Sequence, residues 1–321
     1  MALDPELAFL MTGWWRLACV LVLFVSGSCT QLFFQPMKEQ VLDPHQFGWD
    51  YRDVEFAASD GVRLHGWYFP ASGQQVGSIL FLHGNAENIS THFTSVAWLA
   101  RSGYAVLAID YRGYGRSQGS PDLDGVHLDI AAGLDALLGM PGTDPDRVVV
   151  LGQSLGGALA LTAMAQSPFR DRLRAVIVEG AFSGYRAIVR EKLAQLWLTW
   201  PLQWPLGLTI DDRYDPTAAA AALKGVPLLI IQGEDDLIVP PHHGEILYEA
   251  AHQPKDIWML AGTGHIQAFA DPANRQRLLS YLKSRLASPA LLPAGRHQRI
   301  GMVPSQPLPL PLPGLVEPPL P

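Results

Sequence analysis

The chain has 321 residues, 48% apolar and 17% charged, which suits one globular domain of roughly 240 residues with extensions at both ends. Its formal net charge is -7, and lysine and arginine form no cluster, which argues against nucleic acid as a partner because phosphate binding needs concentrated positive charge. No cluster of metal-ligating residue types stands out in the sequence, so we expect neither a metal nor a cofactor.

The first 29 residues resemble a bacterial export signal. Leu17 to Val25 is an unbroken apolar run after Arg16, and it is too short for a comfortable transmembrane helix. Small residues then precede Cys29 as in a lipobox, although the usual leucine is missing; cleavage there would leave Cys29 as a lipid-modified N-terminus. An uncleaved membrane anchor, simple secretion and a start at Met11 are the alternatives.

Cys19 is the other cysteine, so the domain itself has no thiol or disulfide. We expect a cell-envelope protein, membrane-anchored or periplasmic.

A connector over residues 30–46 leads to a domain of residues 47–287, in which short apolar strands alternate with helices. This alternation predicts an α/β fold with a mostly parallel central sheet flanked by helices, whose chemistry lies at the carboxyl ends of the strands. The expected strands cover 54–57 and 62–69, which form a hairpin, and 78–82, 105–109, 148–151, 175–178, 227–231 and 256–260; the expected helices cover 92–101, 126–138, 156–166, 241–251 and 272–286.

Two segments interrupt the alternation. Residues 185–216 hold Trp197, Trp200 and Trp204 among leucines, and we predict a small helical cap whose tryptophans contact substrate. The alternative is an extra pair of core helices. Residues 288–321 alternate proline with leucine, which favours an extended and disordered tail, either a spacer or a ligand for a partner.

Gly152 to Gly156 match the pattern G-x-S-x-G directly after an apolar run. A strand, a serine between glycines and a helix of small residues form the sequence signature of a nucleophile elbow, in which the tight turn leaves no room for side chains beside the serine. The pattern therefore predicts Ser154 as a nucleophile. The alternative is a helix start at which Ser154 is only the N-terminal cap.

A serine nucleophile needs a histidine base and a carboxylate, which on this architecture follow it in the order acid, then histidine. His265 lies in Gly262 to His265, directly after the strand over 256–260, and glycines let that loop bend back over the elbow. The other histidines precede the serine, begin a helix, enter a strand at its amino end or lie in the tail: His45, His65, His83, His92 and His127; His242 and His243; His252; His297.

The acid is expected in the loop after the strand over 227–231. Asp236 lies three residues after Gly233 and three before Val239, a spacing that turns the carboxylate towards the histidine while the valine packs inwards. Asp235 is the rival in the same loop. Asp211, Asp212 and Asp215, which follow the predicted cap, are the candidates for a variant arrangement.

Acyl transfer also needs backbone N–H groups that bind the oxyanion of the tetrahedral intermediate. One is expected from Leu155, the residue after the nucleophile. The other is expected from the loop after the strand over 78–82, where Asn85 is favoured over Ala86. We expect His83 to hold this loop by hydrogen bonds.

These motifs together resemble the α/β-hydrolase superfamily, and within it the serine hydrolases related to lysophospholipases and membrane-associated acyl-protein thioesterases. The resemblance spans about residues 54–286 and rests on HGNAEN (83–88), DYRGYGRS (110–117), GQSLGG (152–157), GEDDLIVP (233–240) and GTGH (262–265). It implies a triad of Ser154, Asp236 and His265, with Asn85 and Leu155 as oxyanion donors. Leu155 replaces the methionine common in related elbows, which leaves its backbone donor intact.

The sequence therefore predicts a serine hydrolase that cleaves ester or thioester bonds of small lipophilic acyl substrates through an acyl-enzyme. The apolar cap and the expected membrane tether favour lipid-like substrates. The alternatives are a peptidase, a carboxylesterase for small esters, and a non-catalytic scaffold that binds partners through its proline-rich tail.

Overall fold

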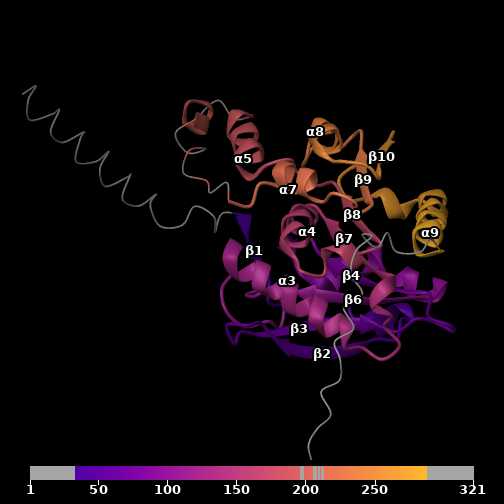
Figure 1. Cartoon of the computed structure of the whole chain (residues 1–321). Helices are drawn as coiled ribbons and strands as arrows, with labels where there is room; N and C mark the ends of the chain where they lie inside the picture. The colour runs from indigo at the N-terminus through magenta and orange to yellow at the C-terminus, as the bar shows by residue number, and fades with distance from the viewer. Residues whose placement is uncertain (1–32, 196–198, 205–207, 209, 211–212, 288–321) are drawn as a thin grey trace, which may run out of the picture. The chain divides into compact units, whose positions relative to one another are not determined.

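The structure is a computed structural model that describes residues 33–195, 199–204, 208, 210 and 213–287. Its centre is an eight-stranded sheet in the order β10-β9-β8-β7-β4-β6-β3-β2 (Figure 1). β3 is antiparallel to both of its neighbours, and the other pairs are parallel, so the predicted, mostly parallel sheet is confirmed. The strands are β2 (Arg52–Ala57), β3 (Arg63–Phe69), β4 (Gly77–Leu82), β6 (Tyr104–Asp110), β7 (Val148–Gln153), β8 (Ala175–Glu179), β9 (Leu228–Gly233) and β10 (Lys255–Leu260).

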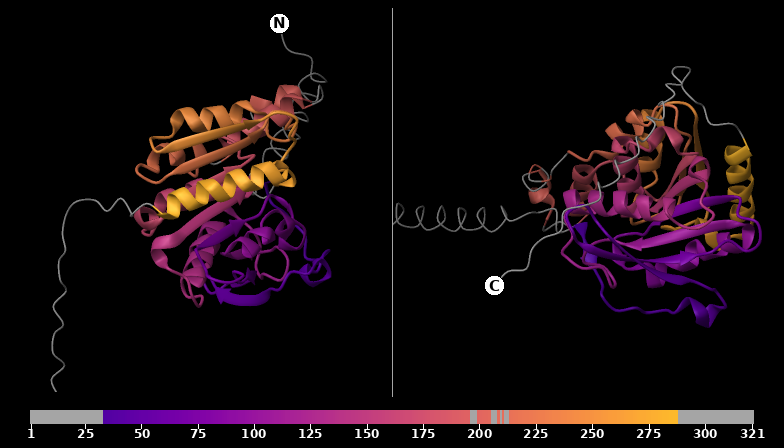
Figure 2. Two further views of the ribbon diagram at one scale, coloured as in Figure 1. Left: turned by 90° about the vertical axis from the view of Figure 1, so that its right-hand side faces the viewer. Right: turned by 60° about the horizontal axis from the view of Figure 1, so that its bottom comes forward.

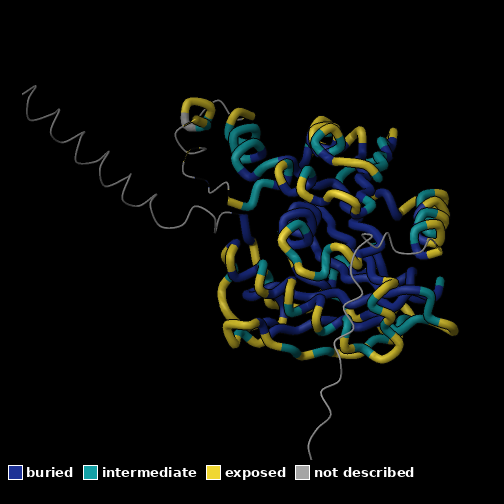
Figure 3. Tube along the Cα trace, viewed as in Figure 1, coloured by how far each residue is buried: buried dark blue, intermediate teal, exposed yellow. Residues whose placement is uncertain are grey.

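Successive side chains of each strand point to opposite sides of the sheet. The central strands β4, β6, β7 and β8 are buried along their whole length, so apolar residues cover both faces there. In β4, Ile79 and Phe81 join one apolar cluster and Leu80 and Leu82 join the other. The cluster of Leu80 and Leu82 also takes residues from four helices: α3 (Leu123–Leu138), α4 (Leu155–Gln166), α7 (Pro216–Ala222) and α8 (His242–Ala250). The cluster of Ile79 and Phe81 takes residues from α9 (Pro272–Ala287), the yellow helix in Figure 2. The central strands are accordingly dark blue in Figure 3.

The single helix expected over residues 92–101 is wrong. The structure has α2 (Ile89–His92) and two short 3-10 helices, η3 (Phe93–Ser95) and η4 (Ala97–Ser102). The hydroxyl of Thr91 donates to the carbonyl of Asn88, and that of Thr94 donates to the carbonyl of Thr91. Such local side-chain bonds to the backbone, together with β-branched residues, weaken a continuous helix.

Residues 33–47, which the sequence predicts mostly as a connector, pack against the domain. Phe33 and Phe34 are buried, and the ring of Phe33 contacts Tyr185 edge-on at a centroid distance of 5.0 Å. β1 (Gln35–Pro36) pairs in parallel with β5 (Ala86–Glu87), and η2 (Pro44–Phe47) follows. The β1–β5 pair holds one side of the loop that follows β4.

The segment predicted as a cap contains α5 (Tyr185–Ala194) and η7 (Trp200–Leu202).

Among the described residues, no helix has the length and apolar character needed to cross a membrane. The predicted export signal with Cys29, the proline-rich tail, Trp197, Asp211 and Asp212 lie outside the described residues.

Candidate active site

Ser154 lies in a tight turn between β7 and α4. Its backbone has φ 54° and ψ -119°, a left-handed φ that is uncommon outside glycine and typical of strained functional positions. A Cβ on Gly152 would collide with the backbone of Gly156, and one on Gly156 would collide with the carbonyls of Leu82 and His83. Both flanking glycines are therefore required by close backbone approach.

Asp236 and His265 meet at the same edge of the sheet. His265 Nδ1 and Asp236 Oδ2 are 2.7 Å apart, and Asp236 Oδ1 accepts the N–H groups of Ile238 and Val239 at 2.8 Å each. Burial alone would raise the pKa of Asp236, but the hydrogen bonds from His265 and from the two backbone N–H groups hold that pKa below its usual value. Asp235 is exposed, whereas Val239 is buried as the spacing predicted.

The end of β8 brings this pair beside the serine. The N–H of Ser154 donates to the carbonyl of Glu179 at 2.8 Å. Gly180 follows, and an ideal Cβ there would lie only 3.2 Å from the His265 ring. Because Nδ1 is bound to Asp236, Nε2 is the ring nitrogen left to face a hydroxyl.

The loop after β4 lies on the other side of the serine. An ideal Cβ on Gly84 would lie 3.5 Å from Cβ of Ser154. The side chain of Asn85 accepts the N–H of Gln35 at 3.0 Å and the hydroxyl of Tyr114 at 3.2 Å, which orders the segment whose N–H is the predicted oxyanion donor. Leu155, the other predicted donor, is buried in the first turn of α4.

His83 holds this loop from within. It is fully buried, which lowers the pKa of the imidazole to about 4 and keeps the ring neutral. Its Nδ1 then donates to the carbonyl of Gly84 at 2.7 Å. Asp110 braces the same region by accepting the N–H of Ile89 at 2.9 Å.

Sequence reasoning excluded His92 because it precedes the serine, yet the structure places it at this edge. Its ring is 3.2 Å from the ideal Cβ position of Gly84, and its Nε2 lies 3.2 Å from the carbonyl oxygen of Ala86. Burial lowers the pKa of His92, so a neutral ring can donate to this carbonyl and order the loop. The only sequence feature that could have indicated this position is that His92 closely follows the HGNAEN motif, which belongs to the loop after β4.

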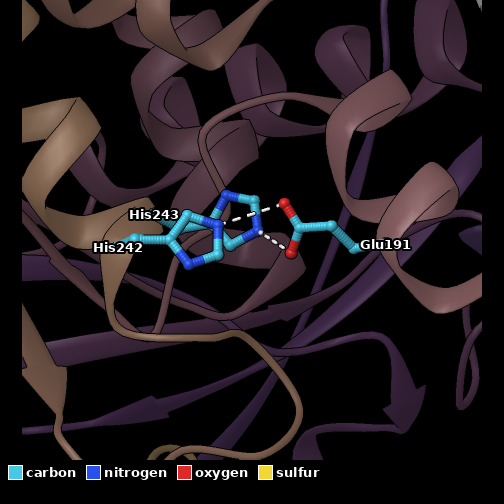
Figure 4. A group of neighbouring side chains, drawn as sticks. All are labelled: Glu191, His242 and His243. Atoms are coloured by element: carbon cyan, nitrogen blue, oxygen red, sulfur yellow. Dashed lines mark hydrogen bonds and ion pairs between the residues drawn. The ribbon is translucent and has the colours of Figure 1, made fainter. Parts of the chain in front are cut away.

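Glu191, His242 and His243 form a second polar cluster, between α5 and α8 (Figure 4). Nδ1 of His243 accepts the N–H of Ser183 at 3.1 Å, so the proton of the neutral ring is on Nε2, which faces Glu191 at 3.2 Å. Burial lowers the pKa of His243 and favours this neutral form. A metal ion bound between these side chains would need a free lone pair on Nε2 of His243, but that nitrogen carries the proton. The geometry therefore fits a hydrogen-bonded tie between α5 and α8 better than a metal site.

The cap tryptophans are only partly described. Trp200 and Trp204 are each 59% exposed, and the guanidinium of Arg190 lies 3.4 Å above the ring of Trp204. Within the described part of the chain, no hydrogen bond or ring contact joins either tryptophan to Ser154, Asp236 or His265. A role for them in substrate binding stays a prediction.

Residues 73–219 match the family model of the serine aminopeptidases S33, Hydrolase_4. The chain is 32% identical over 279 residues to the uncharacterized protein YfhR of Escherichia coli O157:H7, which covers 83% of this chain and 94% of that protein. It is also 32% identical over 223 residues to the α/β hydrolase domain-containing protein WAV2 of Arabidopsis thaliana. This match covers 67% of this chain and 71% of WAV2.

Solved structures show the same architecture. A structure of the esterase Pf2001 of Pyrococcus furiosus superposes with a TM-score of 0.64 at 22% identity, covering 79% of this chain and 98% of that one. Acetyl xylan esterase 1 of Thermoanaerobacterium gives a TM-score of 0.57 at 23% identity, covering 78% and 87%. At this identity the similarity concerns the fold.

Proposed function

The chain belongs to the α/β-hydrolase superfamily, and from this premise we propose that it is a serine hydrolase that cleaves ester or thioester bonds of lipophilic acyl substrates. The observation that carries the proposal is the hydrogen bond between Asp236 and His265, beside a serine in a strained strand-to-helix turn. The order of the three residues in the chain is the one this architecture requires.

Each group has a defined step. His265 Nε2 accepts the proton of Ser154 as Oγ attacks the acyl carbon, and Asp236 stabilises the imidazolium through Nδ1–H. The N–H groups of Leu155 and Asn85 bind the oxyanion of the tetrahedral intermediate. His265 then gives its proton to the leaving group, and a water activated by the same histidine releases the acid from Ser154.

Apolar residues beside the acid support a lipophilic substrate. Leu237 and Ile238 directly follow Asp236 and are 84% and 54% exposed. Lys192 of α5 donates to the carbonyl of Leu237 at 3.0 Å, so the cap segment and this apolar loop lie next to each other. An acyl chain is well suited to cover such a surface, because burying apolar area is favourable.

A panel of p-nitrophenyl esters from acetate to octanoate tests the substrate class. We expect kcat/KM to rise by about 10-fold for two added methylenes that become buried. Leucine p-nitroanilide, included because of the aminopeptidase family model, should not be cleaved. A rate that falls steadily with chain length would favour a small-ester carboxylesterase, and cleavage of the anilide alone would favour a peptidase.

Membrane attachment through Cys29 is the second part of the proposal, supported by the sequence pattern alone. Cys29→Ala should shift the protein of bacterial cells from the membrane fraction to the soluble fraction, whereas Cys19→Ala, the matched control, should leave the distribution unchanged. If Cys29→Ala stays in the membrane fraction, lipid modification at this position is refuted and an uncleaved anchor is favoured.

A further inference from the structure

Glu179 is a buried carboxylate that the steps above do not use. It is the last residue of β8 and only 2% exposed, at the sheet edge that carries the loops of Ser154 and His265. Burial raises the pKa of Glu179, and the hydrogen bonds that it accepts oppose that rise. A buried carboxylate is costly unless each of its oxygens accepts a hydrogen bond, so each oxygen of Glu179 needs a donor.

Its two oxygens bind two different loops. Oε2 accepts from Nε2 of Gln153 at 2.7 Å, and Oε1 accepts from the N–H of Ala268 at 2.8 Å. Gln153 directly precedes Ser154, and Ala268 lies three residues after His265. One carboxylate therefore joins the strand that carries the serine to the loop that carries the histidine.

The histidine loop needs this support on its far side. Ile266 has a φ of 48°, an outlier for a β-branched residue, which must be held by the surrounding structure. Before His265, the loop is fixed by the N–H of Asp235, which donates to the carbonyl of Thr263 at 3.1 Å. After it, the N–H of Ala268 donates to Glu179 at 2.8 Å, and Nδ2 of Asn274 donates to the carbonyl of Ala268 at 3.1 Å, so the bond to Glu179 is the one of these two restraints that reaches the strand beside Ser154.

We propose that Glu179 is a positioning residue: by accepting hydrogen bonds from Gln153 and Ala268 it fixes the spacing and direction of His265 relative to Ser154. This inference rests on the proposed function. An error of about 1 Å in such a spacing costs about 100-fold in rate, so the effect belongs in kcat more than in KM.

The test compares Glu179→Gln with a swap, Gln153→Glu/Glu179→Gln, using p-nitrophenyl butyrate. An amide at position 179 has one acceptor, so one of the two donors loses its partner, and we expect kcat to fall by about 10- to 100-fold with KM nearly unchanged. In the swap, the amide at position 179 accepts from the N–H of Ala268 and donates to the carboxylate at position 153. We expect the swap to recover kcat to within about threefold of the wild type.

The matched control is Glu234→Gln, an exposed carboxylate on the loop after β9, which should behave like the wild type. Thermal unfolding and circular dichroism of each variant show whether it is folded. If Glu179→Gln does not fold, Gln153→Met, which removes the donor to Oε2 of Glu179, should still lower kcat by a few-fold, and the swap should still be active.

A folded Glu179→Gln with wild-type kcat would overturn the proposal. A folded swap that is no more active than the single variant would also overturn it, because kcat would then depend on the position of the negative charge and not on the hydrogen bonds. In both cases hydrolysis by the wild type would stand. A wild type without hydrolytic activity would instead refute the proposed function, and this inference with it.

Discussion

Ser154→Ala is expected to abolish ester hydrolysis, with a loss in kcat of about a million-fold, because the remaining groups only bind and polarise the substrate. The measurement is the rate of p-nitrophenyl butyrate hydrolysis by purified, folded protein. Little change in structure should accompany the loss, since removal of one hydroxyl leaves the backbone bond from Ser154 to Glu179 intact.

The chain offers a matched control for this substitution. Ser183 also lies next to a histidine, with its Oγ 2.8 Å from Nδ1 of His243, but it lies outside the strand-to-helix turn that carries Ser154. Ser183→Ala should therefore keep hydrolysis within a few-fold of the wild type. Activity that survives Ser154→Ala but is lost in Ser183→Ala would place the nucleophile at the second serine.

Asp236→Asn is expected to lower kcat by about 10⁴-fold while the protein stays folded, because an amide no longer fixes the histidine tautomer or stabilises its charged form. Asp235→Asn is the matched control: this neighbour is exposed, and its substitution should change kcat by less than about twofold. Equal losses in the two variants would contradict the assignment of Asp236 as the acid.

The wild type and Asp236→Asn should also differ in the pH dependence of their stability. The pKa of Asp236 in the folded state is lower than its ordinary value of 3.8, so its ionised form stabilises the fold above that value, and this contribution is lost as pH falls through the folded-state pKa. The difference in unfolding free energy between wild type and Asp236→Asn should therefore shrink on acidification below about pH 4. Urea titrations at neutral and acidic pH measure it.

The sequence predicted the sheet and the placement of the loops of Ser154, Asp236 and His265 at one edge of it for one physical reason. In a parallel sheet the carboxyl ends of strands share an edge, so loops that follow three strands converge wherever those strands adjoin. The order β10-β9-β8-β7 makes this true here. Of the two acids in one loop, the spacing to Val239 favoured Asp236, and this is the residue that contacts His265.

What the sequence did not reveal depends on contacts between distant residues. The bond from Ala268 to Glu179 spans 89 positions, and no local pattern marks either residue. The pairing of Gln35 with Ala86 likewise joins two strands too short to show alternation. His92 was excluded by its position in the chain order, although side chains from any loop at this edge can approach the serine.

The most direct test is labelling with a fluorophosphonate, which reacts with an activated serine whatever the natural substrate is. After labelling and proteolysis, mass spectrometry should find the adduct on the peptide that contains Ser154, in the wild type and in Ser183→Ala but not in Ser154→Ala. A folded wild type that takes no label, or carries it on another residue, would contradict a nucleophilic Ser154.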